Sequence, residues 1–214
     1  MSILVRPFAR ADRDHVTALI NAHAAAVVPN ISVSVSALLS QLEREPGEFL
    51  VDTWVRERVT LVAAQRSRVV ATAHLLRYSD DDRVSDHFRG AAEIRWLACW
   101  PPAPYWPDSV GAGEALVEAC VGQLARWRPT VAYGGGALPA PGVYGIPEQW
   151  PHVRDLYLGA GFTSQGHAEV VVLARIQDLL RLPGKSALEL RPGRTLGING
   201  TRRRDPPAQL RRLR

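Results

Sequence analysis

Apolar and polar positions alternate along this chain in runs that predict both strands and helices. Period-two alternation or β-branched runs predict strands at residues 3–8, 58–65, 69–78, 92–100, 130–133 and 169–176. Apolar residues three and four apart predict helices at 15–28, from Ser36 to the Pro46-Gly47 stop, at 110–127 and at 148–160. A further strand is predicted to start at Phe162. The early strands form a meander and the later ones alternate with helices, which predicts a mixed α/β sheet.

The apolar density falls after Leu182, where arginine and proline dominate. Residues 185–214 hold nine Lys or Arg and two acidic residues, so the net charge of this segment is +7. The whole chain has a net charge of +5, which leaves −2 for residues 1–184. We therefore expect a folded domain at 1–182 and a basic, disordered tail at 183–214. Nucleic acid is expected to contact the protein only through that tail.

The composition narrows the class of protein further. Hydrophobic residues make up 46% of 214 positions, which is enough for the core of one domain. No apolar run reaches membrane-spanning length, and the apolar start before Arg6 is too short for a signal peptide. Cys99 and Cys120 lie in apolar segments, which favours buried thiols over a disulfide or a zinc site. A cytoplasmic protein without a membrane or metal partner is expected, and a homodimer is left open.

The segment from Ala91 to Leu116 combines a strand, a proline-rich connection and a glycine-bearing turn that opens a helix. Glycines let backbone N–H groups approach an anion closely, and a helix N-terminus adds partial positive charge. This order suggests a ligand that carries phosphate. Glycines at a helix start also serve packing, so the motif alone leaves both interpretations open.

Four motifs stand in order along the chain: Val5-Arg6-Pro7-Phe8, Leu97-Ala98-Cys99-Trp100-Pro101, Asp108-Ser109-Val110-Gly111-Ala112-Gly113 and Leu156-Tyr157-Leu158-Gly159-Ala160-Gly161-Phe162. Together they resemble the GNAT superfamily of acyl-CoA-dependent N-acyltransferases, over roughly Val5 to Ile176. The resemblance implies an α+β fold: a mixed, mostly antiparallel sheet with helices on both faces and a splay between its fourth and fifth strands. It also implies transfer of an acetyl group from acetyl-CoA to a primary amine of a small molecule or protein.

The same resemblance assigns roles to residues. Backbone groups of Leu97, Ala98 and Cys99 would pair with the pantetheine amides, with a backbone N–H near Ala98 holding the developing oxyanion. N–H groups of Val110, Gly111, Ala112 and Gly113 would hold the pyrophosphate. Glu93 would be the general base for the amine, and Tyr157 the general acid for the leaving thiolate.

Each assignment has a structural alternative. Glu93 could pair with Arg95, and Tyr157 could be a core residue with its hydroxyl bonded internally. His152 and His167 are not assigned, because an isolated histidine is more often a surface or internally bonded group. The aromatic residues near the motif either wall an acceptor pocket or simply pack; they are Trp96, Trp100, Tyr105 and Trp106. The acceptor site itself is expected from residues 21–45 and from the acidic loop 79–90, which otherwise reads as a solvated loop.

Two departures from the family bear on the donor. Asp108 stands where Gln or Arg is usual, and a carboxylate repels a pyrophosphate unless it caps the helix instead. The connection Pro101–Pro107 is longer than usual and stiff. A second function therefore stays open, a catalytically degenerate binding module whose Arg-rich tail contacts a polyanion. Residues 194–201 resemble the entry to a second domain in tandem relatives.

Overall fold

The computed structural model describes residues 2–43, 53–101, 109–140, 142–164 and 208–209. The chain divides into two compact units, one of Met1–Gln165 with Pro206–Arg214 and one of Gly166–Asp205. All described residues belong to the first unit. The strand predicted at 169–176 and most of the predicted tail therefore lie outside the described residues. The strand predicted to start at Phe162 is wrong for residues 162–164, which are described and are not in a strand.

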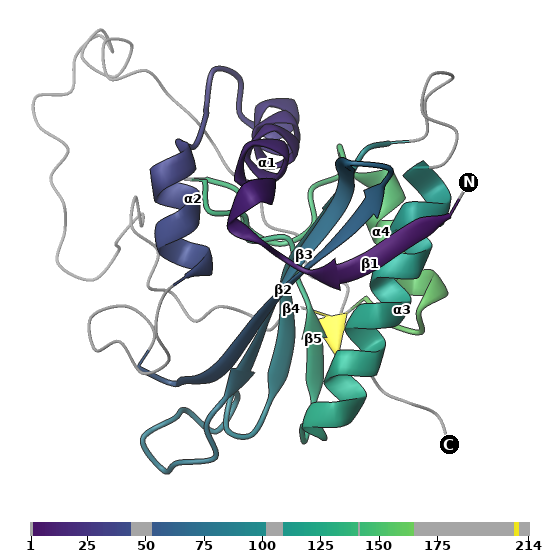
Figure 1. Ribbon diagram of the computed structural model, residues 1–214. Helices are drawn as coiled ribbons and strands as arrows, with labels where there is room; N and C mark the ends of the chain where they lie inside the picture. The colour runs from purple at the N-terminus through teal and green to yellow at the C-terminus, as the bar shows by residue number, and fades with distance from the viewer. Residues whose placement is uncertain (1, 44–52, 102–108, 141, 165–207, 210–214) are drawn as a thin grey trace, which may run out of the picture. The chain divides into compact units, whose positions relative to one another are not determined.

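The sheet runs in chain order, and neighbouring strands are antiparallel except for the parallel pair of β4 and β5. Its strands are β1 (Ile3–Pro7), β2 (Val55–Gln65), β3 (Arg68–Tyr78), β4 (Ala92–Cys99), β5 (Ala132–Gly134) and β6 (Ala208–Gln209). This arrangement confirms the predicted α+β fold with a mixed, mostly antiparallel sheet (Figure 1).

Helices cover both faces of the sheet. α1 (Arg13–Val27) and α2 (Val35–Leu42) lie on one side, and α3 (Ser109–Trp127) lies on the other (Figure 1). α4 (Pro151–Gly159) packs against α3 and β4. The sequence predicts α4 from residue 148, but Pro151 takes the first helical position, where its fixed φ is favourable, and keeps Trp150 out of the helical conformation.

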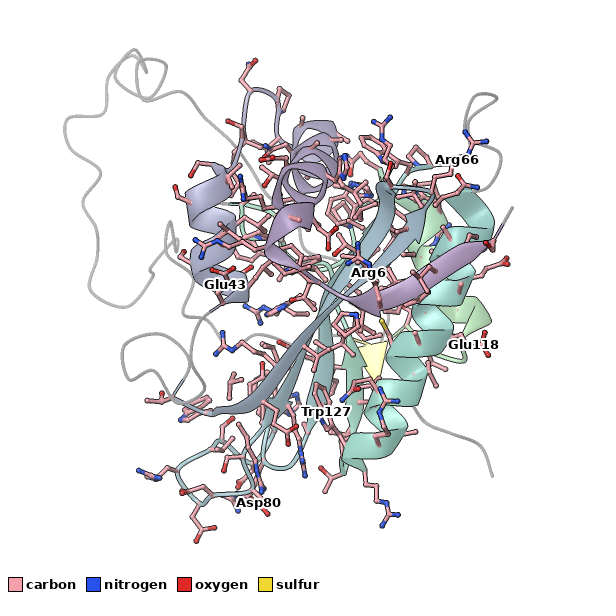
Figure 2. All side chains as sticks on the ribbon, viewed as in Figure 1. Arg6, Glu43, Arg66, Asp80, Glu118 and Trp127 are labelled. Carbon is pink, nitrogen blue, oxygen red and sulfur yellow. The ribbon has the colours of Figure 1, made fainter. Side chains whose placement is uncertain are left out.

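The main core lies between α3, the sheet and α1. The α3 face predicted to be apolar is buried, and its members are Leu116, Val117, Cys120, Leu124 and Trp127. Figure 2 shows Trp127 reaching back to the sheet, where its indole N–H donates to Glu57 at 2.9 Å. A second, smaller cluster lies where Tyr78 and Tyr133 come together.

An ion pair fixes the chain between β1 and α1. Arg6 donates two hydrogen bonds to Asp12, of 2.6 and 2.8 Å, and Asp12 also accepts from the Ala9 amide at 2.9 Å. The hydrogen bond from Arg6 lowers the pKa of Asp12 from its usual value. Asp12 thus closes the short 3₁₀ turn Arg10–Asp12 that precedes α1.

Candidate active site

β5 remains beside β4 for a short distance only. The parallel register covers residues 92–94 of β4, and the next backbone bonds run from Gly135 N–H to the Ile94 carbonyl (2.9 Å) and from Ala137 N–H to the Arg95 carbonyl (3.1 Å). Residues 96–99 of β4 keep β3 on one side and have no strand of the described chain on the other. The fourth and fifth strands therefore diverge, as the GNAT resemblance implies.

A β-bulge at Arg95 shifts the alternation of β4. The pairing with β3 skips Arg95 between His74 and Leu75, so Arg95 is the extra residue. After the bulge, the alternation of the backbone is therefore reversed. The N–H and C=O groups that would face β3 in a regular strand now face away from it.

The shifted alternation decides which backbone groups reach the open edge. The Arg95 carbonyl faces the β5 side, and the Trp100 N–H points back to the Val70 carbonyl of β3 at 3.2 Å. Leu97 and Cys99 therefore direct their N–H and C=O groups to the open edge, and Ala98 directs its own to β3. The sequence analysis predicts that Leu97, Ala98 and Cys99 pair with the pantetheine amides. The backbone groups of Leu97 and Cys99 point to the open edge as this pairing requires, and those of Ala98 do not.

A cavity of about 810 Å³ opens at the Cys99 end of this edge, between α3 and α4. Its wall is largely apolar and includes Trp100, Pro101, Val117, Val121, Leu156 and Ala160. Its charged side chains are all carboxylates, those of Glu114, Glu118 and Asp155; Figure 2 shows Glu118 on the side of α3 turned away from the sheet. Cys99 lines the cavity, whereas Leu97 and Ala98 are fully buried.

The N-terminus of α3 lies at Ser109. The amides without an intrahelical acceptor are therefore those of Ser109, Val110 and Gly111, while Ala112 and Gly113 are already inside the helix. Gly113 has a packing role, because a Cβ there would lie 2.7 Å from Leu156 of α4. A Cβ at Gly111 would meet only Ile3, at 3.5 Å. Packing thus explains Gly113, whereas the phosphate interpretation of Gly111 stays a prediction.

Tyr157 stands where β5 leaves β4. Its hydroxyl donates to the Gly135 carbonyl at 2.9 Å, and its ring packs so closely on Gly134 that a Cβ there would lie 2.8 Å away. Burial raises the pKa of Tyr157 well above its usual value, and the nearby Cys120 and Glu93 add to this rise. Tyr157 is therefore protonated at neutral pH, the state that a general acid needs.

Glu93 is buried on β4 and bound by two donors. Oε1 accepts from the Tyr78 hydroxyl at 2.7 Å and from Arg95 at 3.1 Å, so the alternative of a pair with Arg95 is confirmed. Glu93 does not line the cavity. Its role as a base stays a prediction, as does that of Tyr157 as an acid.

Two histidines that the sequence analysis did not assign meet at the open edge. His152, at the start of α4, lines the cavity and donates from Nε2 to the Cys99 carbonyl at 3.1 Å. His23 of α1 is buried, with its ring centroid 5.6 Å from that of His152. Nothing in the sequence links His23 with His152, which lie 129 residues apart. His167 lies outside the described residues.

The acidic loop behaves as a solvated loop. Asp81 pairs with Arg83 at 2.8 Å, and Arg89 lies 3.0 Å from Asp86 and 3.6 Å from Asp82. The two arginines of the loop thus pair with three of its four carboxylates, and Asp80 lies 3.7 Å from Arg56 of β2. Among the aromatic candidates, Trp96 is fully buried beside His74 and Trp100 lines the cavity, while Tyr105 and Trp106 lie outside the described residues.

The described residues contain no group of three His, Cys, Asp or Glu that could hold a metal ion. None of the described helices combines the length and the apolar character that a bilayer span requires.

No family model and no curated protein sequence matches the chain. Solved structures do resemble it. The acetyltransferase YncA of Salmonella typhimurium, solved with acetyl-CoA, is 21% identical, with a TM-score of 0.51 over 76% of this chain and 80% of that one. A ribosomal-protein-alanine N-acetyltransferase of Brucella melitensis is 18% identical, with a TM-score of 0.53 over 76% and 86%. A transcriptional regulator of Bacillus halodurans is 12% identical, with a TM-score of 0.53 over 80% and 100%. At these identities the likeness establishes the fold alone, and that fold is the GNAT acetyltransferase fold.

Proposed function

We propose that the protein is an N-acetyltransferase that moves an acetyl group from acetyl-CoA to a primary amine of a small molecule or a protein. The observation that carries this proposal is the open edge of β4 beside a cavity of about 810 Å³ at Cys99. An extended arm with amide groups can pair with such an edge as an added strand would.

The residues present suit the neutral arm of the donor better than its phosphates. The apolar wall and the backbone of Cys99, which lines the cavity, match a pantetheine arm, whereas the carboxylates of the cavity would repel an anion. The diphosphate therefore belongs at the N-terminus of α3, where the amides of Ser109, Val110 and Gly111 point along the positive end of the helix dipole.

When bound, acetyl-CoA supplies an activated thioester. Glu93 would take the proton of the attacking amine through Oε2, because both of its donors bind Oε1. To give its proton to the departing thiolate, the Tyr157 hydroxyl would first have to turn away from the Gly135 carbonyl. The two side chains are close enough for Glu93 to raise the pKa of Tyr157.

The described cysteines favour direct attack over an acyl-cysteine route. Burial raises the pKa of Cys99 to about 12 and that of Cys120 further still. A thiol in this state is almost never a thiolate at neutral pH, and only the thiolate is an effective nucleophile.

Calorimetric titration with acetyl-CoA tests the proposal, followed by an amine screen that detects released thiol. Ala160→Trp should fill the cavity and abolish binding, because Ala160 lines it. Leu158→Trp is the matched control, since Leu158 lies two residues before Ala160 at the end of α4, is 49% exposed and does not line the cavity. Absence of binding to the unmodified protein, or equal binding by both variants, would reject this donor site.

The acceptor, the cytoplasmic location and any homodimer remain proposals from the sequence. The binding-module alternative predicts that removal of residues 185–214 abolishes polyanion binding and that no amine is acetylated.

A further inference from the structure

The Cys99 carbonyl at the open edge is already occupied in the free protein. His152 donates to it from Nε2 at 3.1 Å. A carbonyl oxygen only accepts, so His152 carries its proton on Nε2. A carbonyl oxygen has two lone pairs, but a carrier amide in the cavity reaches Cys99 from the side on which His152 lies, so it competes with His152 for this carbonyl.

His23 offers a second acceptor close by. Its Nδ1 lies 2.9 Å from the Leu19 carbonyl, which places the proton of the neutral ring on Nδ1 and leaves Nε2 with a bare lone pair. Nε2 of His23 is buried and has no hydrogen-bond partner within the described part of the chain. A buried acceptor without a hydrogen-bond partner destabilises the folded state.

The two rings are held within reach of each other. Their centroids lie 5.6 Å apart at 54°, and the Cys99 carbonyl acts on both rings. The indole N–H of Trp150 donates to the His23 carbonyl at 3.2 Å, which ties the start of α4 to α1.

We infer that His152 and His23 form an exchange pair that selects a ligand with an amide N–H at the open edge of β4. The ligand's N–H takes the Cys99 carbonyl, and His152 turns its Nε2–H to Nε2 of His23. Binding thus satisfies a buried acceptor that the free protein leaves unpaired. This inference rests on the proposed function for its ligand, acetyl-CoA, and both histidines are positioning residues.

Counting hydrogen bonds gives a prediction that a purely structural role does not share. In the unmodified protein, binding gains one hydrogen bond in total. In His23→Phe the displaced His152 has no acceptor, so the gain vanishes and the Kd for acetyl-CoA rises roughly five- to tenfold. In the double variant His23→Phe/His152→Phe nothing is displaced, so the Kd returns close to that of the unmodified protein.

Calorimetry with acetyl-CoA on the full chain, with His15→Gln as a surface control on α1, measures these values. Nitrogen-15 NMR of the imidazoles reads the same exchange without variants: Nε2 of His23 should change from unbonded to hydrogen-bonded on addition of acetyl-CoA. Rescue by the second substitution and this shift support the pair. An unchanged Kd in His23→Phe, or a double variant weaker than the single one, overturns it. If the unmodified protein does not bind acetyl-CoA, the proposed function fails and the exchange with it.

Discussion

Acidification from neutral pH to about pH 4 should destabilise the fold through His23. Burial lowers the pKa of His23 from 6.5 to about 4, and His152 contributes to the same direction. The unfolded chain takes up this proton as the pH falls below 6.5, but the folded chain does not until about pH 4. The free energy of unfolding is therefore highest above pH 6.5. It falls as the pH drops from 6.5 to about 4 and levels off below about pH 4.

The size of the effect follows from the two pKa values. Each pKa unit corresponds to about 1.4 kcal/mol, so a change from 6.5 to about 4 removes about 3 kcal/mol of unfolding free energy. His23 is only 4% exposed, so solvent screening does not reduce this figure greatly. A loss of this size is a large part of the stability of a typical domain.

Urea unfolding measured from neutral pH down to pH 4 tests this prediction. Other groups titrate in the same window, so the useful quantity is the difference between the unmodified protein and His23→Phe. The variant should be as stable at neutral pH, because it loses an unpaired buried acceptor, and more stable by about 3 kcal/mol at pH 4. Parallel curves for the two proteins would show that His23 is not held neutral by burial.

Three further predictions follow from other contacts. Glu93→Gln should lower kcat for amine acetylation about a hundredfold or more, with acetyl-CoA binding unchanged; an unaltered kcat excludes Glu93 as the base. Gly134→Ala should lower the thermal midpoint, since its Cβ would lie 2.8 Å from the Tyr157 ring, whereas Gly122→Ala in α3, with nothing within 4 Å, should raise it slightly; equal shifts would contradict this packing. Asp12→Asn should reduce stability at neutral pH and lose this effect in acid, because the lowered carboxyl pKa stabilises only while Asp12 is ionised; a pH-independent difference would argue against the ion pair.

Much of the fold could be predicted from the sequence, since most of its elements have strong periodicity. The meander of β1 to β4 and the buried face of α3 agree with the predictions to within a few residues. β5 is only three residues long, Ala132–Gly134, and was predicted at 130–133, because so short a strand carries little pattern. The role of Gly136, which follows β5, was explained only by the structure: a Cβ there would lie 2.0 Å from the Gly145 carbonyl oxygen.

The candidate site was predictable where a local motif carried it. Tyr157 and the open edge at Cys99 follow from the motifs, and the structure places both at the divergence of β4 and β5. The bulge at Arg95 was not predictable, because it depends on pairing with β3 rather than on the residues of β4 alone. The contact between His23 and His152 is likewise a product of tertiary packing between α1 and α4.

The bulge at Arg95 lies between the Glu93 carboxylate and the part of β4 whose backbone faces the open edge. Before it, Glu93 is buried with its carboxylate on Tyr78, and after it the backbone of Cys99 faces the open edge. In a regular strand, the residues at 96 and 98 would face that edge instead, and the Cys99 carbonyl would point to β3. The extra residue thus brings the Glu93 carboxylate and a hydrogen-bonding edge into one short strand. Because Arg95 is also the partner of Glu93 at 3.1 Å, the residue that shifts the backbone also holds the carboxylate in place. Loss of the bulge should therefore impair donor binding and proton transfer together, whereas Glu93→Gln should impair only the second.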